Sequence, residues 1–235
     1  MHGLLTACGP AASGGGVTFG FLGDSALLIR VEGHPSLSAN AVVHRLADAV
    51  RHAALPGIRD VVPGMCELVV HLDPLGSDVA LLEASIREWA ASAEAGDEAR
   101  TAPGALVEVA VQYGGPDLEQ VADSCGLVPD EVCRRHAAVE YVVCFTGFLP
   151  GFAYLGGLDP MLRLPRRATP RPRVEAGSVA IADGFAGIYP SASPGGWHVI
   201  GHTDARLFDL DADPPALLVP GGRVRFVPAS GLRCP

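Results

Sequence analysis

The 235-residue sequence contains no lysine, and all 17 of its basic residues are arginines. This absence excludes a Walker-type phosphate lysine, a Schiff-base lysine and a biotin-carrying lysine in this chain. If the protein binds phosphate, arginine side chains and backbone N–H groups must therefore hold it.

Three other absences narrow the class of protein. No window approaches 18 consecutive apolar residues, so the sequence predicts no membrane-spanning helix. Residues 1–16 are rich in glycine and alanine and lack the basic segment of a signal peptide, which predicts a disordered tail. The six cysteines include no C-x-x-C pair, which speaks against a zinc knuckle and a secreted disulfide scaffold. We therefore expect a cytoplasmic protein.

The charge balance is acidic, with a formal net charge of −9, and 49% of the residues are hydrophobic. So large an apolar fraction can bury a sizeable core, which indicates a soluble globular protein. Non-specific nucleic-acid binding and attraction to anionic membranes both need a basic surface. We expect neither nucleic acid nor membrane as a partner.

The first half of the sequence shows the pattern of a small two-layer α/β domain. Residues 17–31 are apolar around a Gly23-Asp24-Ser25 turn, which predicts a hairpin or two short strands. Apolar residues then recur at helical spacing and in β-type runs between Gly and Pro stops. The predicted elements are a helix over 36–54, strands over 58–63 and 66–72, and a helix over 78–95.

The second half predicts a closed β-sheet. Residues 95–104 are charged and small and end at Pro103-Gly104, which marks a boundary between domains at 17–100 and 105–235. Beyond it, strands separated by Gly/Pro turns continue from residue 140 to 227, as in a β-barrel. A strand over 106–111 and short helices over 118–124 and 129–136 precede them. The predicted fold class is α+β.

The central stretch begins with the bend Gly147-Phe148-Leu149-Pro150-Gly151-Phe152-Ala153-Tyr154. Pro150-Gly151 suits the two central positions of a type II turn, because proline presets φ near −65° and glycine accepts positive φ. Phe148, Phe152 and Tyr154 therefore flank a bend. Either these rings fill the core of a barrel, or they form the wall of a ligand site that glycine allows a ligand to approach closely.

A cluster of arginines follows the bend. Residues 163–173 contain five arginines and no acidic residue, although the whole chain is acidic: Arg163, Arg166, Arg167, Arg171 and Arg173. Three prolines keep the segment extended rather than helical. The segment is either a solvated loop or an anion site, and its rigidity favours the anion site.

A glycine turn at Pro194-Gly195-Gly196-Trp197 is the third candidate feature. Gly195 and Gly196 could offer successive backbone N–H groups to an anion, and Trp197 could stack on a flat ligand. An ordinary hairpin explains the same residues. The carboxylates nearby have no spacing diagnostic of acid–base chemistry or of a metal site, so the residues alone predict an anion-binding β domain joined to an α/β module.

The ordered motifs resemble the family of the 5-oxoprolinase B subunit, also called KipI or allophanate hydrolase subunit 1. They are GF-x-PGF-x-YL, the PR-rich segment, GSVAIA, G-x-YP, SPGGW and IG-x-T, and they run from Gly147 to Thr203. The likeness extends over roughly residues 20 to 228. It implies a small α/β domain followed by a cyclophilin-like β-barrel.

The resemblance also implies an activity. The family opens 5-oxo-L-proline to L-glutamate with ATP, accompanied by Mg²⁺, and acts with a homologous C subunit and a separate A subunit of the 5-oxoprolinase. Under this hypothesis Arg167 and Arg171 are catalytic, because phosphoryl transfer requires positioning and charge neutralisation. The residues expected to bind substrate or nucleotide are Phe148, Pro150, Phe152, Tyr154, Arg166, Arg173, Gly195, Gly196 and Trp197.

Three other functions stay open at this point. A KipI-type protein would bind and inhibit a sensor histidine kinase. An allophanate-type amide hydrolase or carboxyltransferase would act on urea-derived or biotin-linked substrates. A prolyl isomerase would need the arginine pocket of true cyclophilins, whose sequence motifs are not present.

Overall fold

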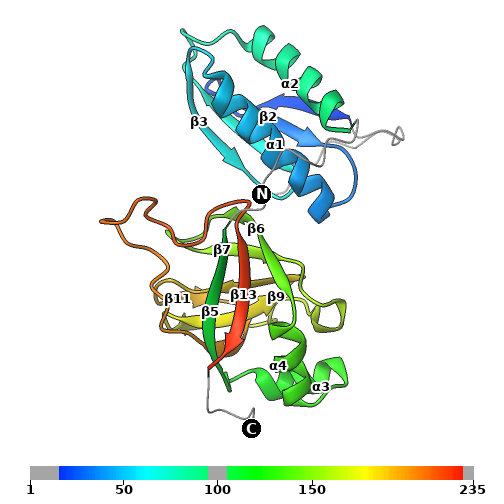
Figure 1. Cartoon of the computed structure of the whole chain (residues 1–235), viewed down its shortest axis with the longest axis vertical. Helices are drawn as coiled ribbons and strands as arrows, with labels where there is room; N and C mark the ends of the chain where they lie inside the picture. Colours follow the sequence, from blue (N-terminus) through cyan, green and yellow to red (C-terminus); the bar gives the residue numbers. More distant parts are fainter. Residues whose placement is uncertain (1–15, 95–104, 230–235) are drawn as a thin grey trace. The chain divides into compact units, whose positions relative to one another are not determined.

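The computed structural model describes residues 16–94 and 105–229. The chain divides into two compact units, residues 1–98 and 99–235, and each is described by itself (Figure 1). The tail predicted over 1–16, apart from Gly16, and the boundary predicted at 95–104 lie outside the described residues. Within the described ranges, no helix is long and apolar enough to cross a membrane.

The N-terminal unit is a four-stranded antiparallel sheet packed against two helices. The strand order is β1-β2-β4-β3, and α1 packs on β2, β3 and β4 while α2 packs on α1 and β1. The predicted hairpin, strands and helices are confirmed. The elements are β1 (Val17–Phe21), β2 (Ala26–Val31), α1 (Leu37–Ala53), β3 (Ile58–Pro63), β4 (Glu67–Leu72) and α2 (Val79–Glu94).

Local sequence explains the helix ends in this unit. The Ser36 hydroxyl accepts a hydrogen bond from the backbone N–H of Ala39 and caps α1, since the first turn of a helix leaves its N–H groups without partners. Ala54 ends α1 in the left-handed region at φ 45°. Alternate β2 residues such as Leu27 and Ile29 are buried against the helices, as a half-buried strand requires.

The C-terminal unit is a closed β-barrel with two short helices. The strand order is β10-β7-β6-β13-β5-β12-β9, and the described barrel strands pair antiparallel except for β13 beside β5, which is parallel. The predicted α+β class is confirmed. Its elements are β5 (Leu106–Tyr113), α3 (Leu118–Cys125), α4 (Pro129–Ala137), β6 (Glu140–Thr146), β7 (Ala153–Gly156), the 3₁₀ turn η2 (Pro160–Leu162), β8 (Arg171–Val174), β9 (Ser178–Ala182), β10 (Phe185–Ile188), β11 (Ser193–Gly195), β12 (His198–His202) and β13 (Arg223–Pro228).

Strand β9 is buried on both faces, which explains its continuous apolar run. Val179 and Ile181 point into the barrel core, whereas Ala180 and Ala182 belong to a second apolar cluster. That cluster also contains Val174 of β8, so the two-stranded sheet β8–β11 covers one outer side of the barrel. We call this two-stranded sheet the ribbon.

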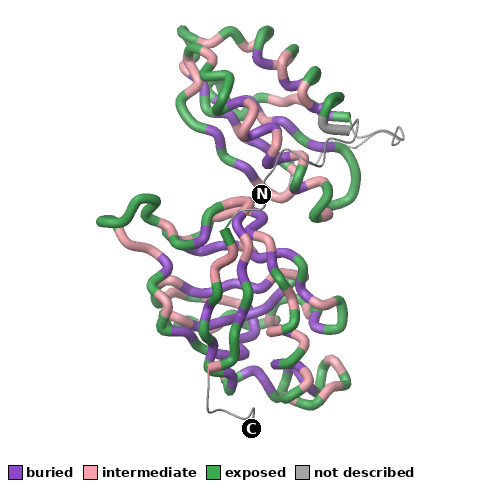
Figure 2. Tube along the Cα trace, viewed as in Figure 1, coloured by how far each residue is buried: buried purple, intermediate pink, exposed green. Residues whose placement is uncertain are grey.

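A long connection between β12 and β13 leaves the barrel surface. Residues 209–215 of this connection are mostly exposed, and Figure 2 shows the segment in green where it extends from the barrel. An isolated bridge between Phe208 and Ala216 closes its base. The bend before β7, the ribbon and this loop all belong to the C-terminal unit.

Candidate functional site

The bend before β7 contains the predicted type II turn. The Leu149 carbonyl accepts a hydrogen bond from Phe152 N–H at 2.9 Å, and Gly151 has φ +83°, so this prediction is confirmed. Leu149 N–H also donates to the Gly147 carbonyl at 2.9 Å, which makes Phe148 the centre of a three-residue γ-turn at φ 72°. This φ is costly for a bulky residue, and Phe148 is 58% exposed.

The aromatic residues of the central stretch form one cluster around Phe152. Its ring meets Phe148, Tyr189 and Trp197 edge to face, with centroids 5.4, 5.4 and 5.5 Å away. Tyr154 contacts both Phe152 and Trp197 at 5.1 and 5.6 Å. Phe152 and Trp197 are buried, so these two fill a core as the first interpretation of the bend expects. Phe148 alone of the five is exposed.

The glycine turn lies between this cluster and the ribbon. Gly195 pairs with Arg171 across β11 and β8, and the Gly196 carbonyl accepts a hydrogen bond from Arg167 N–H at 2.8 Å. A Cβ atom at Gly195 would overlap the hydroxyl and ring of Tyr189, whereas one at Gly196 would meet Pro170 at an ordinary 3.8 Å. Only glycine fits at residue 195 because the tyrosine occupies the space of a side chain.

Two arginines of the cationic segment converge on one buried carboxylate, that of Asp117. Arg171 donates from Nη1 and Nη2 to the two carboxylate oxygens at 2.7 and 2.6 Å. Arg167 donates from Nη1 to Oδ1 at 2.5 Å and to Gln120 Oε1 at 3.2 Å. Charge-assisted bidentate bonds of this kind are short and strongly directional.

Asp117 also connects the arginines to the barrel. It is the N-cap of α3 and is 1% exposed. Its Oδ2 accepts a hydrogen bond from Val199 N–H at 2.7 Å, and its own N–H donates to the Val199 carbonyl at 3.0 Å. Burial alone raises the pKa of Asp117, but the hydrogen bonds from Arg171 and Val199 outweigh burial and hold the pKa below its usual value. Asp117 is thus a carboxylate at neutral pH.

The remaining arginines of the predicted site pair with other acidic residues. Arg166 Nε lies 2.8 Å from Asp183, and Arg173 Nε lies 2.7 Å from Glu175, with all four side chains well exposed. No residue of the segment is helical, but it is extended only in part, since residues 168 and 169 form a bend and strand β8 begins at Arg171; its acidic partners come from outside residues 163–173. The structure brings Arg167, Arg171, Gly195 and Gly196 together, and leaves Arg166 and Arg173 in exposed pairs of their own.

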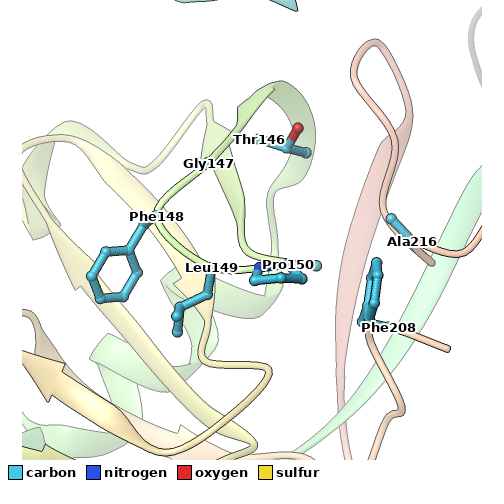
Figure 3. A pocket seen from close by; sticks show the side chains of 8 residues that line it. Thr146, Gly147, Phe148, Leu149, Pro150, Phe208 and Ala216 are labelled. Atoms are coloured by element: carbon cyan, nitrogen blue, oxygen red, sulfur yellow. The ribbon is translucent and has the colours of Figure 1, made fainter. Parts of the chain in front are cut away.

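Pro150 lies on the far side of the bend. It lines a cavity of about 430 Å³ between residues 146–151 and the base of the long loop at Phe208 and Ala216. Figure 3 shows Pro150 and Phe208 on opposite sides of this cavity, with the Phe148 ring projecting away from it. Pro150 therefore shapes the bend and lines the cavity, and Phe148 lines it as well, although its ring points away from Phe208.

Both units fall within one known type of domain. Residues 17–218 match the model of the carboxyltransferase domain, subdomain C and D. The chain belongs to this family. The matched residues include the bend, the ribbon and Asp117.

Individual relatives agree with the family assignment. The chain is 43% identical over 211 residues to the 5-oxoprolinase B subunit of Escherichia coli O157:H7, covering 88% of this chain and 94% of the relative. It is 38% identical over 219 residues to the 5-oxoprolinase B subunit of Bacillus subtilis strain 168, covering 88% and 90%. The crystal structure of TTHA0988 superposes with a TM-score of 0.76 at 36% identity, and covers 89% of this chain. The match spans only 41% of TTHA0988, so this family member corresponds to about two fifths of that longer chain.

Sequence reasoning left three residues of this family member out of the candidate site: Asp117, Gln120 and Tyr189. Asp117 stands 50 residues before Arg167, and its position after Gly-Gly-Pro is typical of a helix start. Local pattern could predict the cap but not the arginine partners. A buried carboxylate is rare unless it is paired with a cation. Apolar residues around Asp117 in the sequence were therefore the one signal that could have pointed to a cationic partner.

The described residues contain no group of three or more His, Cys, Asp or Glu side chains that could hold a metal ion. What the arrangement can do is bind an anion, since two guanidinium groups and one carboxylate leave one net positive charge.

Proposed function

We propose that this chain is one component of an ATP-dependent 5-oxoprolinase. The complex would convert 5-oxo-L-proline, ATP and water into L-glutamate, ADP and phosphate in the cytoplasm, with a homologous C subunit and an A subunit as partners. Two relatives of nearly full length carry the name of the 5-oxoprolinase B subunit, which supports the proposal. This chain alone is expected to be inactive.

The observation that carries the proposal is the position of Arg167 and Arg171. Their guanidinium groups meet at Asp117, and their backbones contact the glycine turn at Gly195 and Gly196. Tyr189 links that turn to the exposed ring of Phe148, with centroids 6.3 Å apart. A cationic pair beside an exposed ring suits a small cyclic anion.

Opening the lactam requires that the reactants be bound in position and that their negative charge be neutralised. Resonance stabilises a lactam, so its opening needs activation, and the phosphoryl group of ATP would supply it by making the amide oxygen a leaving group. Arg167 and Arg171 would hold an anionic group of the reactants in place, and Phe148 would orient the ring. Fixed donors of this kind cost no reorganisation during the reaction.

The other predicted residues have supporting tasks in this proposal. Phe152, Tyr154 and Trp197 would hold Phe148 and Tyr189 in position, and Pro150 would set the bend. Gly195 and Gly196 would bring the ribbon close to the ligand. Arg166 and Arg173, each paired with a carboxylate, would offer further hydrogen-bond donors at the exposed edge.

The test is reconstitution with the two partner proteins. Glutamate release from 5-oxo-L-proline and ATP hydrolysis are measured with the wild-type chain, with Arg167→Lys and Arg171→Lys, and with the control Arg134→Ala. The exposed side chain of Arg134 pairs with Glu131 within α4. Lysine keeps the charge beside Asp117 but loses the bidentate fork, so turnover should fall about 10- to 100-fold. The control should retain full activity.

Two results would count against the proposal. No glutamate from a complete complex whose wild-type chain is folded would exclude the activity. Equal turnover by wild type and both lysine variants would leave the activity in place but remove the arginine pair from the site.

A further inference from the structure

The Arg167 guanidinium has one edge without a partner. Its Nη1 is occupied by Asp117 and Gln120, whereas its Nε is buried and has no hydrogen-bond partner within residues 16–94 and 105–229. No hydrogen bond of Nη2 is found in those residues either. Nε and Nη2 form the side of the guanidinium group that binds a carboxylate through two parallel hydrogen bonds.

Arg171 differs from Arg167 in this respect. Both of its terminal nitrogens, Nη1 and Nη2, donate hydrogen bonds to the carboxylate of Asp117. The hydrogen bond from Asp117 raises the pKa of Arg171 further, so the pair stays ionised. Of the two arginines that meet at Asp117, only Arg167 has its Nε–Nη2 edge without a partner, and the atoms that cover the buried Nε must move for a ligand to reach it.

A buried donor without a partner requires an explanation. Leaving such a group unpaired destabilises the folded protein, and native proteins contain few of them. Arg134 shows the same edge with its hydrogen bonds made. Its Nε and Nη2 donate to the two carboxylate oxygens of Glu131 at 2.8 and 2.6 Å. Arg167 presents the same edge with no carboxylate opposite it.

The charge of the cluster selects among anions. Asp117 cancels one of the two guanidinium charges, so the cluster carries a single net positive charge. A monocarboxylate would be neutralised there, whereas the triphosphate of a nucleotide would keep an excess of negative charge. Phosphate sites of nucleotides rely on several cations or a metal ion.

We propose that the Nε–Nη2 edge of Arg167 is the subsite for the carboxylate of a small cyclic monocarboxylate, and that Asp117 restricts the site to one negative charge. This inference rests on the proposed function, in which the ligand is 5-oxo-L-proline. The nucleotide triphosphate is then bound elsewhere in the complex. Asp117 acts through the arginines and is a positioning residue.

The first experiment is equilibrium binding by isothermal titration calorimetry. The full chain, alone and in the reconstituted complex, is titrated with 5-oxo-L-proline, with its uncharged carboxamide and with ATP plus Mg²⁺. Arg167→Lys should weaken binding of 5-oxo-L-proline about 10- to 100-fold, because it loses the fork while keeping its charge beside Asp117. Binding of ATP should change less than about twofold, and Arg134→Ala should behave as wild type.

A second measurement needs no variant. The Nε–H signal of Arg167, assigned in a ¹H–¹⁵N spectrum through its proton contacts, should shift when 5-oxo-L-proline is added and stay in place with the carboxamide. An Nε–H signal that does not respond to saturating 5-oxo-L-proline would overturn the subsite even if Arg167→Lys failed to fold.

Other outcomes separate this inference from the proposed function. Equal loss of ATP and 5-oxo-L-proline binding in Arg167→Lys, carboxamide binding as tight as that of the acid, or no binding of 5-oxo-L-proline to wild type would each overturn the subsite. If the complex releases glutamate with an unchanged KM for 5-oxo-L-proline in Arg167→Lys, the subsite fails and the function stands. If no glutamate forms but 5-oxo-L-proline binding depends on Arg167, the function fails and the subsite stands.

Discussion

Asp117 and Arg171 form a two-point ion pair, with bonds of 2.7 and 2.6 Å between residues 54 positions apart in the chain. The carboxylate belongs to the start of α3 and the guanidinium to the first residue of β8. Because Asp117 also binds the Val199 backbone, this pair attaches the ribbon to the barrel. The attachment of the ribbon to the barrel therefore depends on one buried side chain.

Replacing this carboxylate should strongly destabilise the C-terminal unit. Asp117→Ala leaves Arg167 and Arg171 without their shared partner, and removing one member of a buried pair costs about 3–5 kcal/mol. The measurement is urea unfolding followed by Trp197 fluorescence in a Trp89→Phe background, so that only the barrel reports. Glu175→Ala breaks an exposed pair with Arg173, which solvent screens, and should leave the unfolding free energy nearly unchanged. Similar losses in the two variants would contradict the buried role.

The buried ring of His136 should make the barrel less stable in acid. His136 lies in α4, its Nδ1 is 2.8 Å from the Tyr113 hydroxyl, and its ring stacks on Phe226 at 4.5 Å. Burial lowers the pKa of His136 from 6.5 to about 3. Between these values only the unfolded chain takes up the proton, so the free energy of unfolding falls as pH falls, by about 2 kcal/mol from pH 7.5 to 5.0.

His136→Phe provides the control for this pH dependence. The variant keeps an aromatic ring beside Phe226 but cannot titrate, so its unfolding free energy should change less over the same pH range. The two proteins are compared by urea unfolding at pH 7.5, 6.5 and 5.0. Parallel curves for wild type and variant would show that another group carries the proton.

Substitutions at Phe148 and Phe152, four residues apart, should affect different properties: the first ligand affinity, the second the stability of the barrel. Phe148→Gly relieves a φ of 72° and removes a mostly exposed ring, so stability should change by no more than about 1 kcal/mol. Affinity for 5-oxo-L-proline should nevertheless fall about tenfold, because the exposed ring is lost. Phe152→Ala removes a buried ring and should cost about 3–5 kcal/mol. Unfolding curves and calorimetric titrations measure the two effects, and a Phe148→Gly chain with wild-type affinity would remove this ring from the site.

The two adjacent glycines should also differ. Gly195→Ala forces a Cβ into Tyr189, which should destabilise the barrel by about 1–3 kcal/mol. Gly196→Ala has ordinary contacts with Pro170 and should change stability by less than about 0.5 kcal/mol. Thermal melts of the two variants measure the difference. A larger loss of stability in Gly196→Ala would show that backbone conformation, rather than contact with Tyr189, explains why this turn needs glycine.

Local pattern predicted most elements of the fold. The helix expected over residues 36–54 is α1 (Leu37–Ala53), and the short helices expected over 118–124 and 129–136 are α3 and α4. These segments are recognisable from apolar spacing, caps and breakers within a few residues. The turn at Pro150-Gly151 was predictable for the same reason, since its geometry depends on two residue types.

The strand order was not predictable in this way. The pairing of β13 with β5 joins Val224 to Val107, and it is parallel, which no hairpin rule anticipates. The cationic segment illustrates the same limit at the site. Its arginines were visible, but their neutralising partners Asp117, Asp183 and Glu175 come from outside it.

The sequence by itself determined the helices, the turns, the lack of lysine and the family motifs, because each depends on residue identity over a short span. Only the tertiary structure decided that Asp117 joins Arg167 to Arg171, and that Phe148 is exposed while Phe152 and Trp197 are buried. Barrel closure brings distant residues together and determines which side of each strand faces water. The charge and the free donors of the candidate site follow from that closure.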